Sequence, residues 1–255
     1  FLQKPTIQIP KHLTKTYFEK FIVELIGKVD AEVEGFEVIQ EHEIKKAFIQ
    51  SSYDFIKSVW MIELYFDYGA VVFNYADPRT KRTKLSVDES GEVSVQQKIR
   101  IPHSEDAFAK ILVGLGLELD SNKRFYMDGG PYAVFEWLIR NKTELSEEIE
   151  VPSQKVDEME LVLEEAGIGL STEPGKDWFD VKGVIRIGEV SIPFSSLIKN
   201  IRSGERFYPM KDGRFFLIPE EWFSTYHDLA VYGEDGDDYV RMPKSHFNRF
   251  SETEA

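Results

Sequence analysis

A cluster of four basic residues offers the clearest binding chemistry in this chain. The segment DPRTKRTK, residues 77–84, carries Arg79, Lys81, Arg82 and Lys84. Lysine and arginine side chains at this spacing can hold nucleic-acid phosphates, which position a protein on a strand without reading its bases. The same segment is also typical of an exposed, solvated loop, and this simpler interpretation stays open.

Acidic residues and histidines are the next candidates, because carboxylates bind calcium and imidazoles bind zinc. The segment GEDGDDY, residues 233–239, lacks the alternating ligands and the distal glutamate of an EF-hand calcium loop, which favours an acidic turn. The five histidines show no pairing three or four residues apart: His12, His42, His103, His227 and His246. We therefore predict no metal site and no catalytic residue.

Nucleotide chemistry would require a phosphate-binding loop, and the one partial match fails. Gly175-Lys176-Asp177 lacks the leading glycine at the required spacing and the serine or threonine after the lysine. We expect no cofactor to bind this chain. A stand-alone hydrolase stays an alternative, because carboxylates are plentiful and a deep pocket with convergent acids would support it.

Two aromatic pairs complete the candidate residues. Trp178-Phe179 and Trp222-Phe223 lie within the most strongly patterned part of the sequence. We interpret them as core anchors, and Trp178 in particular as a buried one. A docking surface is the alternative, because tryptophan often anchors protein interfaces.

The elements that must position these residues are clearest in residues 177–223. The sequence predicts a strand at 177–188, a return strand at 190–192, a helix at 194–201, and a hairpin of 206–210 and 214–218. Pro193 suits the first turn of that helix, and Gly204 suits the left-handed residue that ends it. Pro219 opens a further helix whose first turn carries two acids.

The first half of the chain alternates hairpins with helices. The predicted helices are 14–28, 105–117 and 131–145, and the predicted strands are 33–39, 43–50, 58–67, 70–75, 84–88, 93–101 and 148–151. Near the end, the sequence predicts a strand at 239–242 and a helix at 243–250. Residues 153–165 fit a strand or a helix equally well.

This order of elements indicates an α+β fold, with antiparallel sheets built from hairpins and with interspersed helices. It shows no regular strand–helix–strand alternation of the kind that builds a parallel sheet. We expect two subdomains, 1–152 and 153–255, the second centred on residues 177–223.

Composition narrows the class of protein. The chain has 42% hydrophobic residues, no cysteine and no run of about 18 apolar residues, so we predict a folded chain without a membrane-spanning helix. Residues 151–255 contain 12 Lys and Arg against 20 Asp and Glu, and the rest contains 19 against 25. Both halves are therefore acidic, which argues against autonomous DNA binding. The missing cysteines, and the absence of a secretory leader, fit a cytoplasmic protein.

A family resemblance rests on residues 177–223. The segment DWFDVKGVIRIGEVSIPF, a short helix, and then DGRFFLIPEEWF resemble the region just upstream of the motor in bacterial Swi/Snf-family helicase-like ATPases. The segment IELYFDYGAVVFNY, residues 62–75, is similar to another element of that helicase-associated region. The two predicted helices at 105–117 and 131–145 follow in the expected order.

This resemblance implies a parent protein whose motor binds ATP and magnesium and is stimulated by DNA. The chain begins at Phe1 and carries none of the motor's motifs, so we expect it to be a piece of a longer protein with the motor elsewhere. The implied function is a non-catalytic accessory or regulatory region. Its implied partners are its own motor domain, DNA through the parent, and proteins of unknown identity. An autonomous nucleic-acid-binding module is the main alternative.

Overall fold

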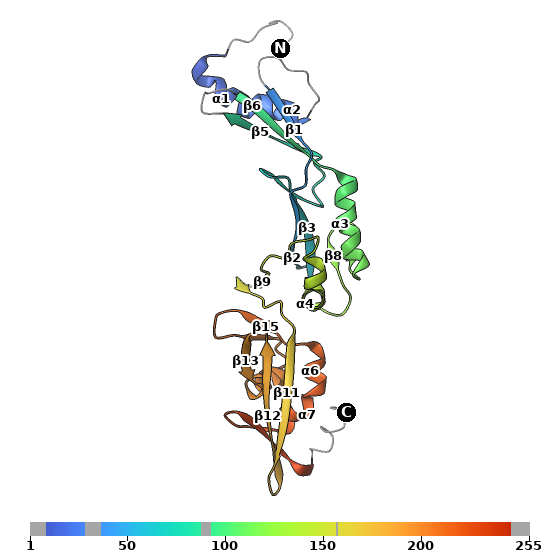
Figure 1. The fold of residues 1–255 in the computed structure, drawn as a ribbon, viewed down its shortest axis with the longest axis vertical. Helices are drawn as coiled ribbons and strands as arrows, with labels where there is room; N and C mark the ends of the chain where they lie inside the picture. The colour runs from blue at the N-terminus through green and yellow to red at the C-terminus, as the bar shows by residue number, and fades with distance from the viewer. Residues whose placement is uncertain (1–8, 29–36, 88–92, 157, 246–255) are drawn as a thin grey trace. The chain divides into compact units, whose positions relative to one another are not determined.

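The computed structural model describes residues 9–28, 37–87, 93–156 and 158–245, and its fold is α+β (Figure 1). The sheets are antiparallel apart from one parallel pair, β1 (Glu37–Glu41) with β6 (Val93–Ile99). No helix in these ranges is long and apolar enough to cross a membrane. Of the predicted C-terminal helix at 243–250, residues 246–250 lie outside the described part of the chain.

The chain divides into two compact units. Unit 1 contains residues 1–54, 61–127 and 145–152, and unit 2 contains residues 55–60, 128–144 and 153–255. Residues 153–255 belong to unit 2 together with two earlier segments, 55–60 and 128–144. The reason is contact: in the helix α4 (Ala133–Leu145), Glu136 forms an ion pair with Arg206, and Tyr132 just before it packs edge-on against Phe207 at 4.9 Å.

The described residues of unit 1 form two sheets. The first has the strand order β1-β6-β5, with β5 (Lys81–Val87) antiparallel to β6. The second has the order β2-β3-β8-β7, with β4 paired to β3; its strands are β2 (Lys46–Asp54), β3 (Val59–Asp67), β4 (Val72–Asn74), β7 (Glu118–Leu119) and β8 (Phe125–Tyr126). The helix α3 (Pro102–Gly114) is confirmed near its predicted position.

The N-terminal helix differs from the prediction in its regularity. The sequence predicts one amphipathic helix over 14–28. The structure has a 3₁₀ turn at η1 (Lys11–Leu13), then α1 (Thr14–Tyr17), a π-helical stretch at η2 (Phe18–Ile22) and α2 (Val23–Lys28). Ile26 is the apolar residue of this segment that is fully buried.

A buried ionic network lies inside unit 1. The guanidinium of Arg100 donates to Glu105, with Nε 2.9 Å from Oε1, and the Tyr68 hydroxyl donates to the same oxygen at 2.8 Å. The backbone N–H of Ile101 donates to the Tyr68 hydroxyl at 2.9 Å, and burial raises the pKa of Tyr68. Glu105 is 1% exposed, so its charge depends on these partners rather than on water.

Unit 2 is built on another five-stranded sheet, with the strand order β11-β12-β17-β16 and with β13 paired to β12. Its strands are β11 (Ala166–Pro174), β12 (Trp178–Ile187), β13 (Val190–Pro193), β16 (Glu234–Asp235) and β17 (Tyr239–Pro243). Two short antiparallel pairs accompany it: β9 (Lys155–Val156) with β10 (Met159–Glu160), and β14 (Phe207–Pro209) with β15 (Phe215–Leu217).

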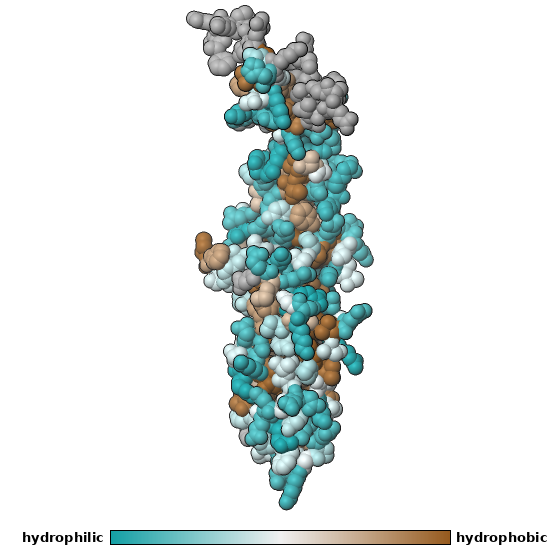
Figure 2. All heavy atoms as spheres, turned by 90° about the vertical axis from the view of Figure 1, so that its left-hand side faces the viewer, coloured by the Kyte–Doolittle hydropathy of each residue, from teal (hydrophilic) through white to brown (hydrophobic). Residues whose placement is uncertain are grey.

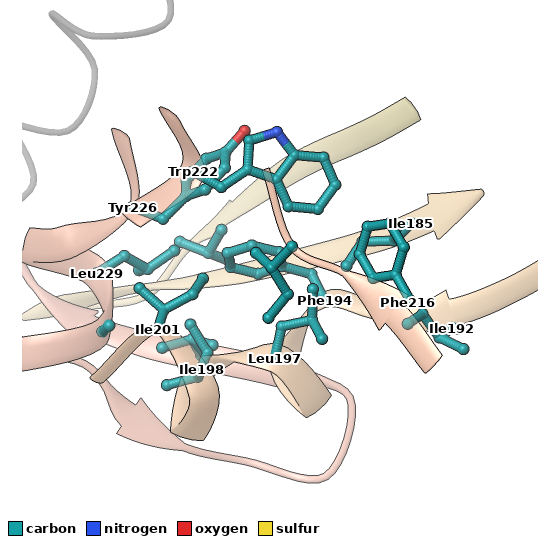
Figure 3. Close-up of a cluster of buried hydrophobic side chains, with 14 of the residues drawn as sticks. Ile185, Ile192, Phe194, Leu197, Ile198, Ile201, Phe216, Trp222, Tyr226 and Leu229 are labelled. Atoms are coloured by element: carbon teal, nitrogen blue, oxygen red, sulfur yellow. The ribbon is translucent and has the colours of Figure 1, made fainter. Parts of the chain in front are cut away.

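Four short helices of unit 2, which come after α4 in the chain, cover one face of this sheet. They are η3 (Phe194–Leu197), α5 (Ile198–Ser203), α6 (Glu220–Thr225) and α7 (His227–Tyr232). Gly204 ends α5 with a left-handed φ of 73°, as the sequence predicts for a glycine at this position. Their apolar side chains meet those of β12 in one buried cluster, in which Phe194, Trp222 and Tyr226 lie together (Figure 3).

On the inner face of the sheet there is no space for a side chain at Gly183. A Cβ atom on Gly183 would lie 2.3 Å from Leu170 and 2.8 Å from Phe194. Glycine therefore lets β11 and η3 approach β12 closely, as glycine in a strand often does.

Candidate interaction surfaces

The basic segment 77–84 forms a turn that compensates part of its own charge. Asp77 accepts hydrogen bonds from both Arg79, at 2.7 Å, and Arg82, at 3.0 Å. The hydrogen bond from Arg79 is the main reason why the pKa of Asp77 lies far below its usual range. Two of the four predicted phosphate-binding cations therefore already share a carboxylate.

The other two cations are separated by strand geometry. Lys81 and Lys84 both lie on β5, three residues apart. Side chains alternate between the faces of a strand, so Lys81 lies on the face opposite to Arg82 and Lys84. The structure thus brings Arg79 and Arg82 together at Asp77 but does not gather all four basic residues on one face.

A shallow hollow of about 580 Å³ lies beside this turn in unit 1. Arg79, Arg82 and Arg124 line it together with Glu63 and Asp77. Arg124 forms salt bridges with Asp54 at 2.6 Å and Asp120 at 3.3 Å, and the Arg82 guanidinium lies 5.3 Å from the centre of the Phe73 ring. Each arginine of the hollow is thus held by an acid of the same unit.

We predict that the isolated chain binds duplex DNA weakly at physiological salt. Any residual affinity should depend mainly on Lys84, which is exposed and forms no salt bridge with another described residue. Lys84→Glu should then weaken binding and lower its salt dependence, whereas Arg79→Glu should change both less. Fluorescence anisotropy at several salt concentrations measures this. Tight binding that ignores both substitutions would contradict the prediction.

Trp178 is not the core anchor that the sequence predicts. It is 36% exposed and lies on the outer face of the unit 2 sheet. The guanidinium of Arg241 lies between two rings, 4.8 Å from Trp178 and 5.2 Å from Tyr239, and Arg241 also forms a salt bridge with Asp180 at 2.8 Å. The hydrogen bond that Arg241 donates to Asp180 in this salt bridge lowers the pKa of Asp180.

The physical reason for this difference is strand parity. Val181, Ile185 and Ile187 occupy the buried face of β12, and side chains an odd number of residues away lie on the other face. Trp178 and Val184 therefore point outward, although a simple count of apolar residues groups them with Val181. The sequence alone does not identify Arg241 and Tyr239 as neighbours of Trp178, because this requires the register of β12 with β17.

Two of the other aromatic candidates, Trp222 and Phe223, lie in or against the core. Trp222 is 7% exposed and belongs to the buried cluster, in which its ring is 6.0 Å from that of Phe216. Phe223 packs against the same cluster and is partly buried. Phe179 is half-buried, with the ammonium of Lys244 5.6 Å from its ring centre.

The acidic segment 233–239 forms a hairpin, in which β16 pairs antiparallel with β17. Asp235 of β16 forms a salt bridge with Arg202 of α5 at 2.8 Å, which orients its carboxylate toward a cation of the chain. Among the described residues, no group of three or more His, Asp or Glu side chains is arranged to hold a metal ion.

Large apolar side chains are exposed at the turn between β2 and β3. Phe55 and Ile56 are 85% and 96% exposed at its tip. Elsewhere, the face in Figure 2 is mainly hydrophilic, with hydrophobic residues in scattered groups. Exposed side chains of this size are more typical of docking surfaces than of solvated turns.

Comparison with known proteins identifies no relative of this chain. No protein-family model, no curated protein and no solved structure matches this chain.

Proposed function

We propose that this chain is a non-catalytic accessory region of a bacterial Swi/Snf-type DNA-dependent ATPase. Its motor, with ATP and magnesium, would lie outside the chain in the same cytoplasmic protein. The region would position or regulate that motor, and DNA would reach it through the parent protein.

The observation that carries this proposal is the place of residues 177–223 in the fold. These residues carry the sequence resemblance, and they supply most of the buried cluster of unit 2, including Ile185, Phe194 and Trp222. The resemblance therefore concerns a large part of the packed core of unit 2 rather than one exposed loop. A scaffold in common with the helicase-associated region supports a similar position beside a motor. A regulatory function in common with that region requires a separate test.

Two surface properties agree with a role in docking. The exposed Phe55 and Ile56 offer an apolar tip of the kind that anchors protein partners. The acidic balance of both halves of the chain, −6 and −8, would repel DNA and attract basic protein surfaces. A DNA-binding motor has such a basic surface, so we expect the region to contact the motor rather than the DNA.

Calorimetric titration of the isolated chain with Mg-ATP tests the non-catalytic part of the proposal. We expect no saturable heat, because the chain contains no phosphate-binding loop. Titration of the intact parent under the same conditions is the positive control. A stoichiometric, micromolar isotherm for the isolated chain would contradict the proposal and would favour an enzyme.

A further inference from the structure

The strand β11 is a long, regular strand at the end of its sheet. All nine of its residues pair with β12, from Ala166 opposite Ile187 to Pro174 opposite Phe179. Among the described residues, none forms a hydrogen bond with the other edge of β11. Such an edge presents a row of backbone N–H and C=O groups that can pair with another strand.

This edge lacks the usual features that prevent pairing. β11 has no bulge in its register with β12, and its only proline, Pro174, is its last residue. Its one charged residue, Glu173, stands next to that end and points outward. Natural sheets commonly block long edges with central charges, prolines or bulges.

The outer face of β11 carries mainly small side chains. Gly167, Gly169 and Ser171 lie on this face, because Ile168 and Leu170 pack on the buried cluster. A hollow of about 300 Å³ lies over the two glycines and is bordered by Val184 and Arg186 of β12. Arg186 is exposed, and no described residue forms a salt bridge with it.

We infer that β11 pairs antiparallel with β11 of a second copy of this chain, around a two-fold axis at Leu170. Only one antiparallel register pairs all nine residues with nine, and it places Leu170 opposite itself. In that register Glu173 of one copy lies opposite Gly167 of the other. The interface is then self-complementary, as a two-fold interface must be.

The charges in this register agree with the pairing. Gly167 lies opposite Arg186 within one copy, so Glu173 of the second copy, Gly167 and Arg186 form one row on the same face. Neighbouring strands are about 4.8 Å apart, so the acid and the arginine face each other across two strand spacings. Glycine leaves this path open, and the extended side chains of glutamate and arginine can meet over it. The two-fold axis generates the ion pair twice.

This inference does not depend on the proposed accessory role, because it uses only the edge, the hollow and the charges of unit 2. The main test is a charge-swap series followed by sedimentation. We expect concentration-dependent dimers of the full chain, weakened about tenfold or more by either Arg186→Glu or Glu173→Arg. The double variant should return to within about threefold of the original affinity, because the swapped charges again face each other.

Two controls separate this interface from a general effect of charge. Lys199→Glu in α5 changes the net charge as much as Arg186→Glu does and should leave dimerisation unchanged. Lys182→Ala removes the cation that forms a salt bridge with Glu173 inside one copy, at 3.3 Å, and should not weaken the dimer. Circular dichroism confirms that each variant is folded.

A cysteine crosslink tests the register itself, because the chain has no cysteine of its own. Leu170→Cys should form a disulfide-linked dimer under mild oxidation, since residue 170 alone faces its own copy. Gly167→Cys should not, because its counterpart lies six residues along the partner strand. A chain that stays monomeric at millimolar concentration would overturn the inference. Dimers whose affinity is unchanged by the single charge reversals, or a double variant whose affinity does not recover, would also overturn it. The same holds if the β11 amides are protected from hydrogen exchange only when a different protein is added.

Discussion

Replacing Glu105 by alanine should destabilise unit 1 by about 3–5 kcal/mol. The substitution leaves the guanidinium of Arg100 in a site where its side chain is 7% exposed, without the carboxylate that now balances it. It also removes the acceptor of the Tyr68 hydroxyl. The cost is that of an uncompensated buried charge, which is larger than the net value of the ion pair.

Urea unfolding combined with hydrogen exchange in β3 measures this loss in unit 1. Glu43→Ala is the matched control, because it removes an exposed ion pair with Lys45 and should change the free energy of unfolding far less than Glu105→Ala does. The double variant Arg100→Met, Glu105→Leu should recover much of the lost stability, since it leaves no unpaired charge. A Glu105→Ala protein as stable as the original would show that water reaches this site.

Trp222→Ala should destabilise unit 2 by about 3–5 kcal/mol, the range for truncating a large buried aromatic residue. The ring is 7% exposed and contacts both Phe216 and Tyr226 in the cluster of Figure 3. Its removal leaves a cavity that helices fixed on the sheet cannot close fully. Urea unfolding followed by circular dichroism gives the change in free energy.

Trp178→Ala is the matched control for this prediction. It removes a tryptophan side chain from the outer face of the unit 2 sheet, where its main partner is the Arg241 guanidinium. A cation–π contact at an exposed site stabilises a protein only weakly, so the expected loss for Trp178→Ala is several times smaller than that for Trp222→Ala. Equal losses for the two variants would contradict the placement of Trp178 on the surface.

Local signals in the sequence were sufficient for most elements of the fold. The hairpin of β14 and β15, the helix end at Gly204 and the start of α6 after Pro219 are confirmed, because turn and capping residues act within a few positions. The strand β11 was missed. Gly167 and Gly169 weaken its strand pattern, and its pairing with β12 is a long-range interaction that propensity does not record.

The candidate sites were less predictable than the fold. The basic residues 79–84 are adjacent in sequence, but Asp77 pairs with two of them and β5 directs Lys81 away from Lys84. The outer face of unit 2 combines residues from β11, β12 and β17, which only the strand register brings together. Composition correctly indicated an acidic chain with real cores, but it carries no information about which side chains share a face.

We propose that this chain regulates a motor without performing the motor's chemistry. The most direct measurement is the ATPase rate of the parent protein against DNA concentration, at two salt concentrations, with and without residues 1–255. The account predicts that basal turnover survives removal of the region while the dependence on DNA and salt changes, because complementary charge acts mainly on encounter and specificity. Loss of turnover at saturating DNA, in a truncated protein shown to be folded, would contradict it and make the region an integral part of the motor.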